Sequence, residues 1–233
     1  MKRPSGAELL RAVVKRGMDP VDASLQRVFM EKAGALSIPI LGKLTDGYVM
    51  AMGADLPPTM YAQLYQTFER LWAIPSPRRP VFPEAYLAYV KERAITCTRP
   101  IVTFACEMLF GLPVPEGRYR TWFTHGDANL SNALLYEGTV RLIDFSPKPT
   151  PSDCAIDQAK LLLSAAGFDN DQPAQALRDL RKEWRDGWDL VNDEPRIYDP
   201  RLKFYYLSHI IRVASRDPRH DEFFFKALRN HCV

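Results

Sequence analysis

Histidine and cysteine are scarce in this sequence of 233 residues, which contains four of each. The cysteines stand at positions 97, 106, 154 and 232, with no C-x-x-C pair and no spacing typical of a metal site. This arrangement excludes a zinc ribbon and favours reduced, packed thiols. Glycine is also limited: no two of the twelve glycines stand two residues apart, so the sequence has no G-x-G loop for covering nucleotide phosphates.

Charge of one sign and long apolar runs are lacking as well. The net charge of +3 comes from 31 basic and 28 acidic residues that are mixed along the chain, which gives no electrostatic reason to expect nucleic acid or an anionic membrane as a partner. The most apolar stretch, residues 101–114, is interrupted by Glu107 and is too short to span a bilayer. The first residues carry charges where a signal peptide needs an apolar core. We therefore expect a cytoplasmic protein without a membrane partner.

Hydrophobic spacing and turn residues predict a mixed α/β beginning, a helical middle, one hairpin and a helical tail. Asp19 is a candidate N-cap with Pro20 at the first helical position, and Asp46–Gly47 and Glu137–Gly138 are candidate hairpin turns. Strands are expected within 38–52, 121–127 and 133–145. Helices are expected over 19–36, 59–74, 84–97, 99–112, 154–167, 175–190, 200–216 and 221–231.

The stretch "THGDANLSN" places His125, Asp127 and Asn132 in one polar loop, and "LIDF" brings Asp144 back on the hairpin that follows. Phosphoryl transfer from ATP requires oxygen ligands that hold Mg²⁺ on the phosphates and a carboxylate that orients the acceptor hydroxyl. A carboxylate and an amide five residues apart can divide these tasks, because one can face the acceptor while the other faces the metal. The pattern therefore points to phosphotransfer.

The spacing H-x-D-x-x-x-x-N followed by D-F matches protein-kinase-like enzymes. The wording "HGDANLSN", "LIDF" and "SDCAIDQAK" resembles the aminoglycoside phosphotransferase and choline kinase family, as does "ERLWAIPSP", where Trp72 replaces a histidine of the family. The resemblance implies an α+β, protein-kinase-like bilobal fold. Its reduced N-terminal lobe would span residues 1–52, and its mostly helical C-terminal lobe would span residues 53–233.

The same resemblance implies roles for individual residues. Asp127 would be the catalytic base, with His125 beside it supporting the loop, and Asn132 and Asp144 would be the Mg²⁺ ligands. Asp157 would hold the catalytic loop from the following helix. The backbone from Met50 to Met52 would contact the adenine of ATP. Asp153 has the simpler role of N-cap for the helix that begins near Cys154.

The residue that grips the phosphates is harder to assign. "RAVVKRG" could be a strand that carries Lys15, with Glu31 on the next helix as its ion-pair partner, and this separation of 16 residues fits the family. However, Ser5 and Glu8 form a capping box and Gly17 is a candidate C-cap, so the local signals favour a helix. Both alternatives remain open from the sequence.

The function indicated is transfer of the γ-phosphate of ATP to a hydroxyl of a small molecule or protein. Residues 151–233 contain 13 Lys/Arg and 14 Asp/Glu, so no acidic excess supports a polycationic aminoglycoside as the acceptor. An alternative is a pseudokinase-type interaction module without transfer activity, and a third is a shortened relative completed by another chain. The sequence does not indicate the oligomeric state. A strand that directs Lys15 toward Asp144 would favour the enzyme.

Overall fold

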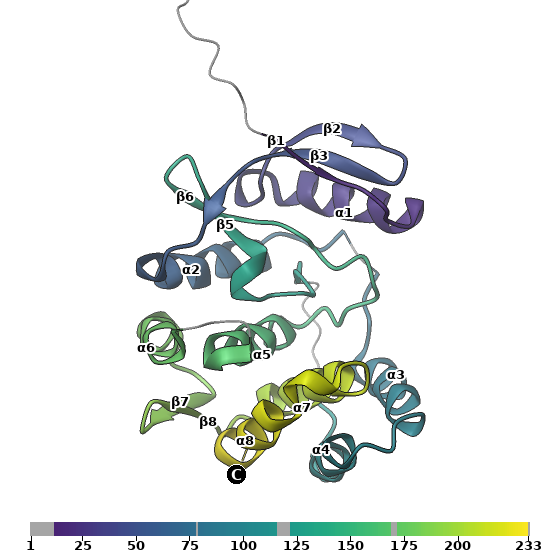
Figure 1. Ribbon diagram of the computed structural model, residues 1–233, viewed down its shortest axis with the longest axis vertical. Helices are drawn as coiled ribbons and strands as arrows, with labels where there is room; N and C mark the ends of the chain where they lie inside the picture. The colour runs from purple at the N-terminus through teal and green to yellow at the C-terminus, as the bar shows by residue number, and fades with distance from the viewer. Residues whose placement is uncertain (1–11, 78, 116–121, 169–171, 233) are drawn as a thin grey trace, which may run out of the picture.

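The computed structural model describes residues 12–77, 79–115, 122–168 and 172–232. A small sheet with helix α1 against it lies at one end of the molecule, and a mostly helical body lies at the other (Figure 1). Loops and a second small sheet occupy the level between them. This is the bilobal α+β organisation that the sequence predicts.

The bounds of the elements in the described part of the chain are as follows. The helices are α1 (Pro20–Ala33), α2 (Tyr61–Trp72), α3 (Pro83–Ile95), α4 (Pro100–Phe110), α5 (Cys154–Leu163), α6 (Pro173–Glu183), α7 (Pro200–Ala214) and α8 (Asp221–His231). The strands are β1 (Ala12–Lys15), β2 (Ile40–Leu44), β3 (Gly47–Ala51), β4 (Ala54–Asp55), β5 (Ala133–Tyr136), β6 (Thr139–Leu142), β7 (Trp188–Val191) and β8 (Glu194–Ile197).

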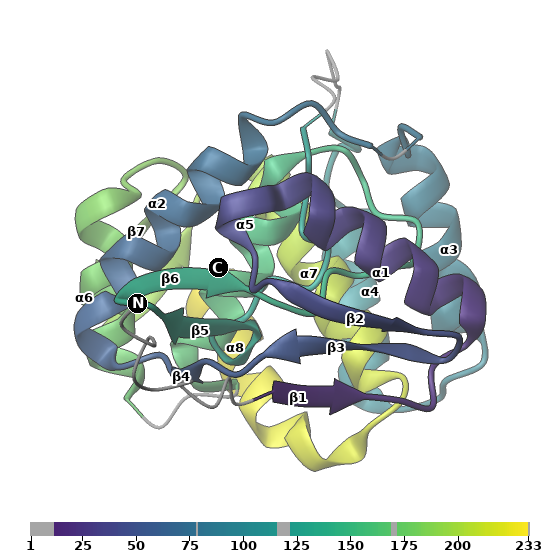
Figure 2. The same cartoon turned by 90° about the horizontal axis from the view of Figure 1, so that it is seen from above.

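The first sheet is antiparallel with strand order β1-β3-β2, and its β1–β3 register places Lys15 opposite Tyr48. Figure 2 shows the three strands side by side. Helix α1 begins as predicted, because the Asp19 carboxylate accepts the backbone N–H groups of Val21 at 2.9 Å and Asp22 at 3.3 Å. The sheet and α1 together form the lobe that carries Lys15.

Residues 12–15 form a strand, so the helix that local signals favour is wrong there. Val13 and Val14 are β-branched and pair with β3, and this long-range pairing outweighs local helix propensity. Gly47 permits the close approach, since an added Cβ would lie 1.9 Å from the backbone oxygen of Lys15. The capping-box residues Ser5 and Glu8 lie outside the described residues.

Both predicted hairpins form. β5 and β6 are joined by Glu137 and Gly138, whose φ angles of 49° and 73° suit a two-residue turn between antiparallel strands. In the first hairpin Leu44 pairs with Gly47, so the turn lies one residue earlier than predicted, at Thr45 and Asp46. The second sheet, of order β4-β5-β6, brings residues 54–55 against the hairpin.

Two expectations for the rest of the chain are only partly met. The helix expected over 175–190 ends at Glu183. Gly187 has a φ of 84°, and its carbonyl accepts the N–H groups of Tyr198 and Asp199. These bonds hold the ends of the β7–β8 hairpin together, and the hairpin replaces the last turns of the expected helix. Within the strand expected over 121–127, Trp122 makes only an isolated bridge to Pro75. The other expected helices are present with ends shifted by a few residues.

Helix α7 is the centre of the helical body and packs against α3, α4 and α5. Its aromatic run, Phe204, Tyr205 and Tyr206, is fully buried and belongs to the core. None of the helices in the described residues is long and apolar enough to cross a membrane.

Candidate active site

A buried carboxylate on α5 holds the loop that contains His125 and Asp127. Asp157 is fully buried, and its Oδ2 accepts the backbone N–H of His125 at 2.7 Å and the indole N–H of Trp72 at 3.0 Å. Its Oδ1 accepts the backbone N–H of Gly126 at 2.8 Å. Three donors therefore compensate for the burial of this carboxylate and fix the backbone on which Asp127 follows.

Only glycine fits between His125 and Asp127. Gly126 has a φ of 79°, and a Cβ there would lie 2.6 Å from Oγ1 of Thr150 and 2.9 Å from Cβ of Ser146. A side chain would therefore meet both a disfavoured backbone conformation and occupied space. The glycine of "HGD" is explained by this close approach.

The imidazole of His125 lies inside the protein rather than in the cleft. Its Nε2 lies 2.7 Å from the carbonyl oxygen of Ile143, and its Nδ1 accepts the backbone N–H of Asp127 at 3.2 Å. Since a carbonyl only accepts, Nε2 is the donor in this contact and Nδ1 is the acceptor. The ring also packs against Phe145, with centroids 4.4 Å apart. This geometry suits the supporting role of His125.

Asp127 and Asn132 face each other across a short turn. The Asn132 amide nitrogen donates to the backbone oxygen of Asp127 at 2.8 Å and to its carboxylate Oδ2 at 3.2 Å. Asn129 shapes the turn, because its side-chain oxygen accepts the N–H of Asn132 at 2.8 Å. Since the Asn132 nitrogen points at Asp127, its amide oxygen is directed elsewhere and remains available to a ligand.

Asp144 is held beside Asn132 in a left-handed backbone conformation with a φ of 59°. The N–H of Ile143 donates to the carbonyl of Asn132 at 3.0 Å, and the N–H of Ser146 donates to the carbonyl of His125 at 2.9 Å. These bonds on either side of Asp144 maintain a conformation that most side chains avoid but aspartate tolerates. The result is that the two candidate metal ligands lie on adjacent chain segments.

The oxygens of Asn132 and Asp144 fit a magnesium site. Neither Asn132 Oδ1 nor Asp144 Oδ2 accepts a hydrogen bond from any residue that the structure describes. Carboxylate and amide oxygens are the hard ligands that Mg²⁺ takes together with phosphates and water. Within residues 12–77, 79–115, 122–168 and 172–232 there is no group of three or more His, Cys, Asp or Glu that could hold a metal by itself.

Lys15 extends from β1 to the other oxygen of Asp144 and forms an ion pair with it. The hydroxyl of Tyr48 lies 3.2 Å from the same oxygen and 3.0 Å from the side-chain oxygen of Gln26 on α1. Burial and the adjacent Asp144 raise the pKa of Tyr48 well above its usual value, so the phenol remains a donor. Lys15, Tyr48 and Asp144 thus connect the two lobes.

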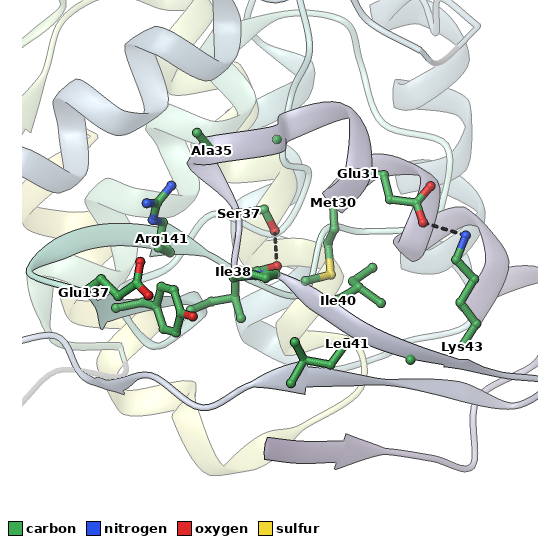
Figure 3. Close-up of a pocket in the computed structure, with 14 residues that line it drawn as sticks. Met30, Glu31, Ala35, Ser37, Ile38, Ile40, Leu41, Lys43, Glu137 and Arg141 are labelled. Carbon is green, nitrogen blue, oxygen red and sulfur yellow. Dashed lines mark hydrogen bonds and ion pairs between the residues drawn. The ribbon is translucent and has the colours of Figure 1, made fainter. Parts of the chain in front are cut away.

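The predicted ion pair between Lys15 and Glu31 is not formed. Glu31 lies on the outer face of α1 and pairs with Lys43 at 2.8 Å (Figure 3). Both line a cavity of about 650 Å³, to which Asp127, Asn132 and Asp144 do not contribute. Helical periodicity explains the error, because Gln26 and Met30 share the buried face of α1 whereas Glu31 does not.

The predicted adenine-binding segment lies where β3 ends. Met50 is a buried residue of β3, and Met52, which follows the strand, is 49% exposed. Gly53 then lets the chain pass close to β5, since an added Cβ would lie 2.8 Å from Cβ of Leu134. The segment therefore connects the two sheets, and its contact with adenine stays a prediction.

Lys160 is a site residue that the sequence reasoning missed. Its Nζ is buried beneath the loop, donates to the carbonyl of Gly126 and lies 3.4 Å from Oδ1 of Asp127. Burial lowers the pKa of Lys160 to about 8, even though Asp127 attracts the proton. Burial acts to raise the pKa of Asp127, but the neighbouring positive charges, Lys160 first among them, together outweigh burial and lower the pKa of Asp127.

A signal for Lys160 was present in the sequence. It is the single charge in the apolar run "AKLLLSAA", and it lies three residues after Asp157, on the same face of α5. Ser164, one turn further along, was also missed, and its hydroxyl accepts the N–H of Leu130 at 2.9 Å. Helix α5 and the residue that follows it therefore hold the loop through the polar side chains of Asp157, Lys160 and Ser164.

No known family model matches this sequence, and no curated protein matches it. Solved structures do. A choline/ethanolamine kinase family protein from Mesorhizobium loti matches with a TM-score of 0.56 and 15% identity, over 94% of this chain and 81% of that one. The aminoglycoside phosphotransferase APH(4)-Ia, a thermostable mutant bound to AMP-PNP and hygromycin B, matches with a TM-score of 0.58 and 16% identity, over 90% and 80%.

A glucosamine kinase in complex with glucosamine, ADP and inorganic phosphate matches with a TM-score of 0.52 and 16% identity, over 94% of this chain and 75% of that one. The chain has the protein-kinase-like fold of choline kinases and aminoglycoside phosphotransferases. The residues that the resemblance singled out lie in two parts of this fold. Lys15 is on a strand of the first sheet, and the others, Asp127, Asn132 and Asp144, lie between the sheets and the helical body.

Proposed function

We propose that this protein is an ATP-dependent phosphotransferase that transfers the γ-phosphate to a hydroxyl group. The observation that carries the proposal is the convergence of Lys15, Asn132 and Asp144 next to Asp127, from three segments of the chain: β1, the loop that holds Asp127 and Asn132, and the residues after β6. A purely structural role would not bring a lysine, two carboxylates and an amide oxygen together with free lone pairs. The kinases that share the fold support the same reaction class.

Magnesium would be held by Oδ1 of Asn132 and Oδ2 of Asp144, and it would neutralise charge on the phosphates when bound. Lys15 would move its charge from Asp144 to the phosphates, since its ammonium group lies at the edge of the same site. The backbone of Met52 would contact the adenine.

Asp127 would orient the acceptor hydroxyl and take its proton. A bond forms between the acceptor oxygen and the γ-phosphorus, the bond from that phosphorus to the β–γ bridging oxygen breaks, and ADP leaves with the electron pair. The lowered pKa of Asp127 keeps it ionised at neutral pH, so it can accept the hydroxyl proton. Its side chain is 50% exposed, which gives a substrate access.

The sequence left a pseudokinase-type interaction module as the alternative. The position of Lys15 favours the enzyme, because β1 directs the lysine to Asp144 rather than away from it. The kinases with this fold are named for choline and ethanolamine, for glucosamine, and for an aminoglycoside, all small molecules with hydroxyl groups. A small molecule is therefore the preferred acceptor class.

Transfer of ³²P from γ-labelled ATP to a panel of hydroxylated small molecules tests the proposal. We expect Mg²⁺-dependent label in at least one acceptor, and loss of at least about a hundredfold in the rate with Asp127→Asn, since this variant removes the proton acceptor. Asp193→Asn is the matched control, because Asp193 pairs with Arg178 on the surface. Label transfer that is equal in Asp127→Asn and the parent would overturn the assignment.

A further inference from the structure

A buried ammonium group lies beneath the loop that contains Asp127. Lys160 projects from α5, which lies between this loop and α7 (Figure 1), and its side chain is only 3% exposed. Its Nζ donates to the carbonyl of Gly126 and lies 3.4 Å from Oδ1 of Asp127. A nucleotide or an acceptor has no access to so buried a nitrogen, so Lys160 can influence the reaction only through the loop.

The carboxylate of Asp127 has a donor at each of its two oxygens. Lys160 lies at Oδ1, and the amide nitrogen of Asn132 donates to Oδ2 at 3.2 Å. The side chain of Asp127 is 50% exposed, so packing alone does not fix its rotation. A carboxylate offers about four lone-pair sites, of which these donors occupy two. They can therefore fix the plane of the group and still leave lone pairs for an acceptor hydroxyl.

The two donors have different tasks. Asn132 also presents its amide oxygen as a proposed magnesium ligand, whereas the ammonium group of Lys160 forms its ion pair with Asp127. Burial of an ammonium group costs free energy that an apolar side chain of the same length would not cost. Asp157, three residues earlier on α5, accepts three N–H donors and forms no ion pair with Lys160. The charge of Lys160 is thus directed at Asp127.

The charge of Lys160 can be changed by pH while its neighbours keep theirs. The other ionisable groups that act on Asp127 and Lys160 lie in the loop and on α5 and α7: His125, Asp157, His209 and Arg212. Burial lowers the pKa of Lys160 to about 8. Burial also lowers the pKa of His209, which is therefore neutral above pH 7, and the pKa of Arg212 is raised by neighbouring phenol groups despite its burial. Of the two basic side chains from these helices that act on Asp127, Lys160 alone changes its charge between pH 7 and 10.

We propose that Lys160 is a positioning residue of the phosphotransfer reaction, whose ammonium group holds the Asp127 carboxylate in the orientation that receives the acceptor hydroxyl. The inference rests on the proposed phosphotransferase function and adds a residue to that site. Without the ammonium group, the carboxylate is held at one oxygen only and spends less time in the productive geometry. A small displacement of a reacting group is enough to slow a reaction strongly.

The first test compares the rates of the parent, Lys160→Met and Lys160→Gln. The acceptor is the hydroxyl compound labelled in the ³²P panel, or water in Mg²⁺-dependent hydrolysis of ATP. We expect kcat to fall by about tenfold or more in Lys160→Met and by less in Lys160→Gln, which keeps a donor, with the KM for Mg²⁺–ATP within about twofold of the parent. Lys182→Met is the matched control, because the exposed Lys182 pairs with Asp179 on α6.

Ser164→Ala separates positioning of Asp127 from support of the loop. It removes the bond from the end of α5 to the N–H of Leu130 and leaves both donors on the Asp127 carboxylate. As Lys160 loses its proton, the ratio of kcat between the parent and Lys160→Met should fall at least about fivefold from pH 7 to 10. The ratio between the parent and Ser164→Ala should not change with pH. A kcat of Lys160→Met equal to that of the parent, or a ratio to the parent that is independent of pH, overturns the inference.

The carboxyl ¹³C resonance of Asp127 gives a measurement that needs no acceptor. In protein labelled with [4-¹³C]aspartate, this resonance is the one absent from Asp127→Asn. We expect it to move with pH in the parent and in Lys182→Met, with a midpoint near the pKa of Lys160, about 8, and not to make this step in Lys160→Met. A resonance that titrates alike in the parent and Lys160→Met overturns the inference. Absence of phosphate transfer by the parent to every compound and to water counts against the proposed function, and the resonance still decides whether Lys160 acts on Asp127.

Discussion

The indole N–H of Trp72 donates to Oδ2 of Asp157 at 3.0 Å, the same oxygen that accepts the backbone N–H of His125 at 2.7 Å. Trp72 stands where the family that the sequence resembles has a histidine, and its indole N–H supplies a donor to the buried carboxylate from that position. The bond connects α2 to α5 beneath the catalytic loop. Asp157 is therefore fixed from two helices and one loop.

Removing this donor should destabilise the protein. In Trp72→Phe the buried carboxylate loses one of its three donors, so we expect the free energy of unfolding to fall by about 1–3 kcal/mol more than in Trp184→Phe. Trp184 is buried and stacks on Tyr65, and its indole N–H makes no hydrogen bond to the residues that the structure describes, so this control removes the same atoms without the bond. Urea unfolding measures the difference, and equal losses would contradict the account.

Gly126 and Gly138 have similar φ angles, so comparing their substitutions by alanine distinguishes the cost of backbone strain from the cost of a steric clash. Gly126→Ala should cost about 1–3 kcal/mol more than Gly138→Ala and reduce transfer activity, because the added methyl group collides with Thr150 and Ser146. Gly138 has a φ of 73° and open space around it, so its substitution meets only the backbone cost. Thermal unfolding and the transfer rate measure both effects; a Gly126→Ala protein as stable and active as Gly138→Ala would refute the steric argument.

The lowered pKa of Lys160 predicts that the stability of the folded protein depends on pH. Its pKa is about 8 in the folded protein against 10.5 for an ordinary lysine, so between these values the unfolded chain binds more protons than the folded one. Stability should therefore rise with pH in this window, by on the order of 3 kcal/mol relative to Lys160→Met. Urea unfolding of both proteins from pH 7 to 10.5 gives the difference, and parallel curves would exclude a buried, charged Lys160.

Tyr48 should act on nucleotide binding rather than on folding alone. Tyr48→Phe removes the hydroxyl between Asp144 and Gln26, so Asp144 loses one of the groups that orient it. We expect a KM for Mg²⁺–ATP several-fold higher, about 1 kcal/mol in binding, because a hydrogen bond to a charged group is lost. Tyr198→Phe, at an exposed position, should leave the KM unchanged, and a parental KM in Tyr48→Phe would remove Tyr48 from the site.

The site residues that could be predicted from the sequence are those that lie close to one another along the chain. Asp127, Asn132 and Asp144 lie on one loop and its hairpin, so their intervals alone bring them together. Lys15 could not be decided in the same way, because its strand exists only through pairing with β3, more than 30 residues away. Long-range pairing is invisible to a local helix signal.

The partners of these residues were harder to find. The charge of Glu31 and its spacing from Lys15 predict an ion pair between these two residues. In the structure, the buried face of α1 instead places Gln26 next to Tyr48. Lys160 approaches Asp127 from a helix that follows it by more than 30 residues. Its position depends on how α5 packs beneath the loop, and its spacing from Asp157 is only a weak sign of that packing in the sequence.

The most direct test of the central claim is a calorimetric titration of AMP-PNP, with and without Mg²⁺, into the parent protein and Asp144→Asn. If Asn132 and Asp144 hold the metal on the phosphates, Mg²⁺ should tighten binding to the parent by about tenfold or more, and this gain should disappear in Asp144→Asn. An affinity that does not depend on Mg²⁺, or a gain that survives in Asp144→Asn, would contradict the claim.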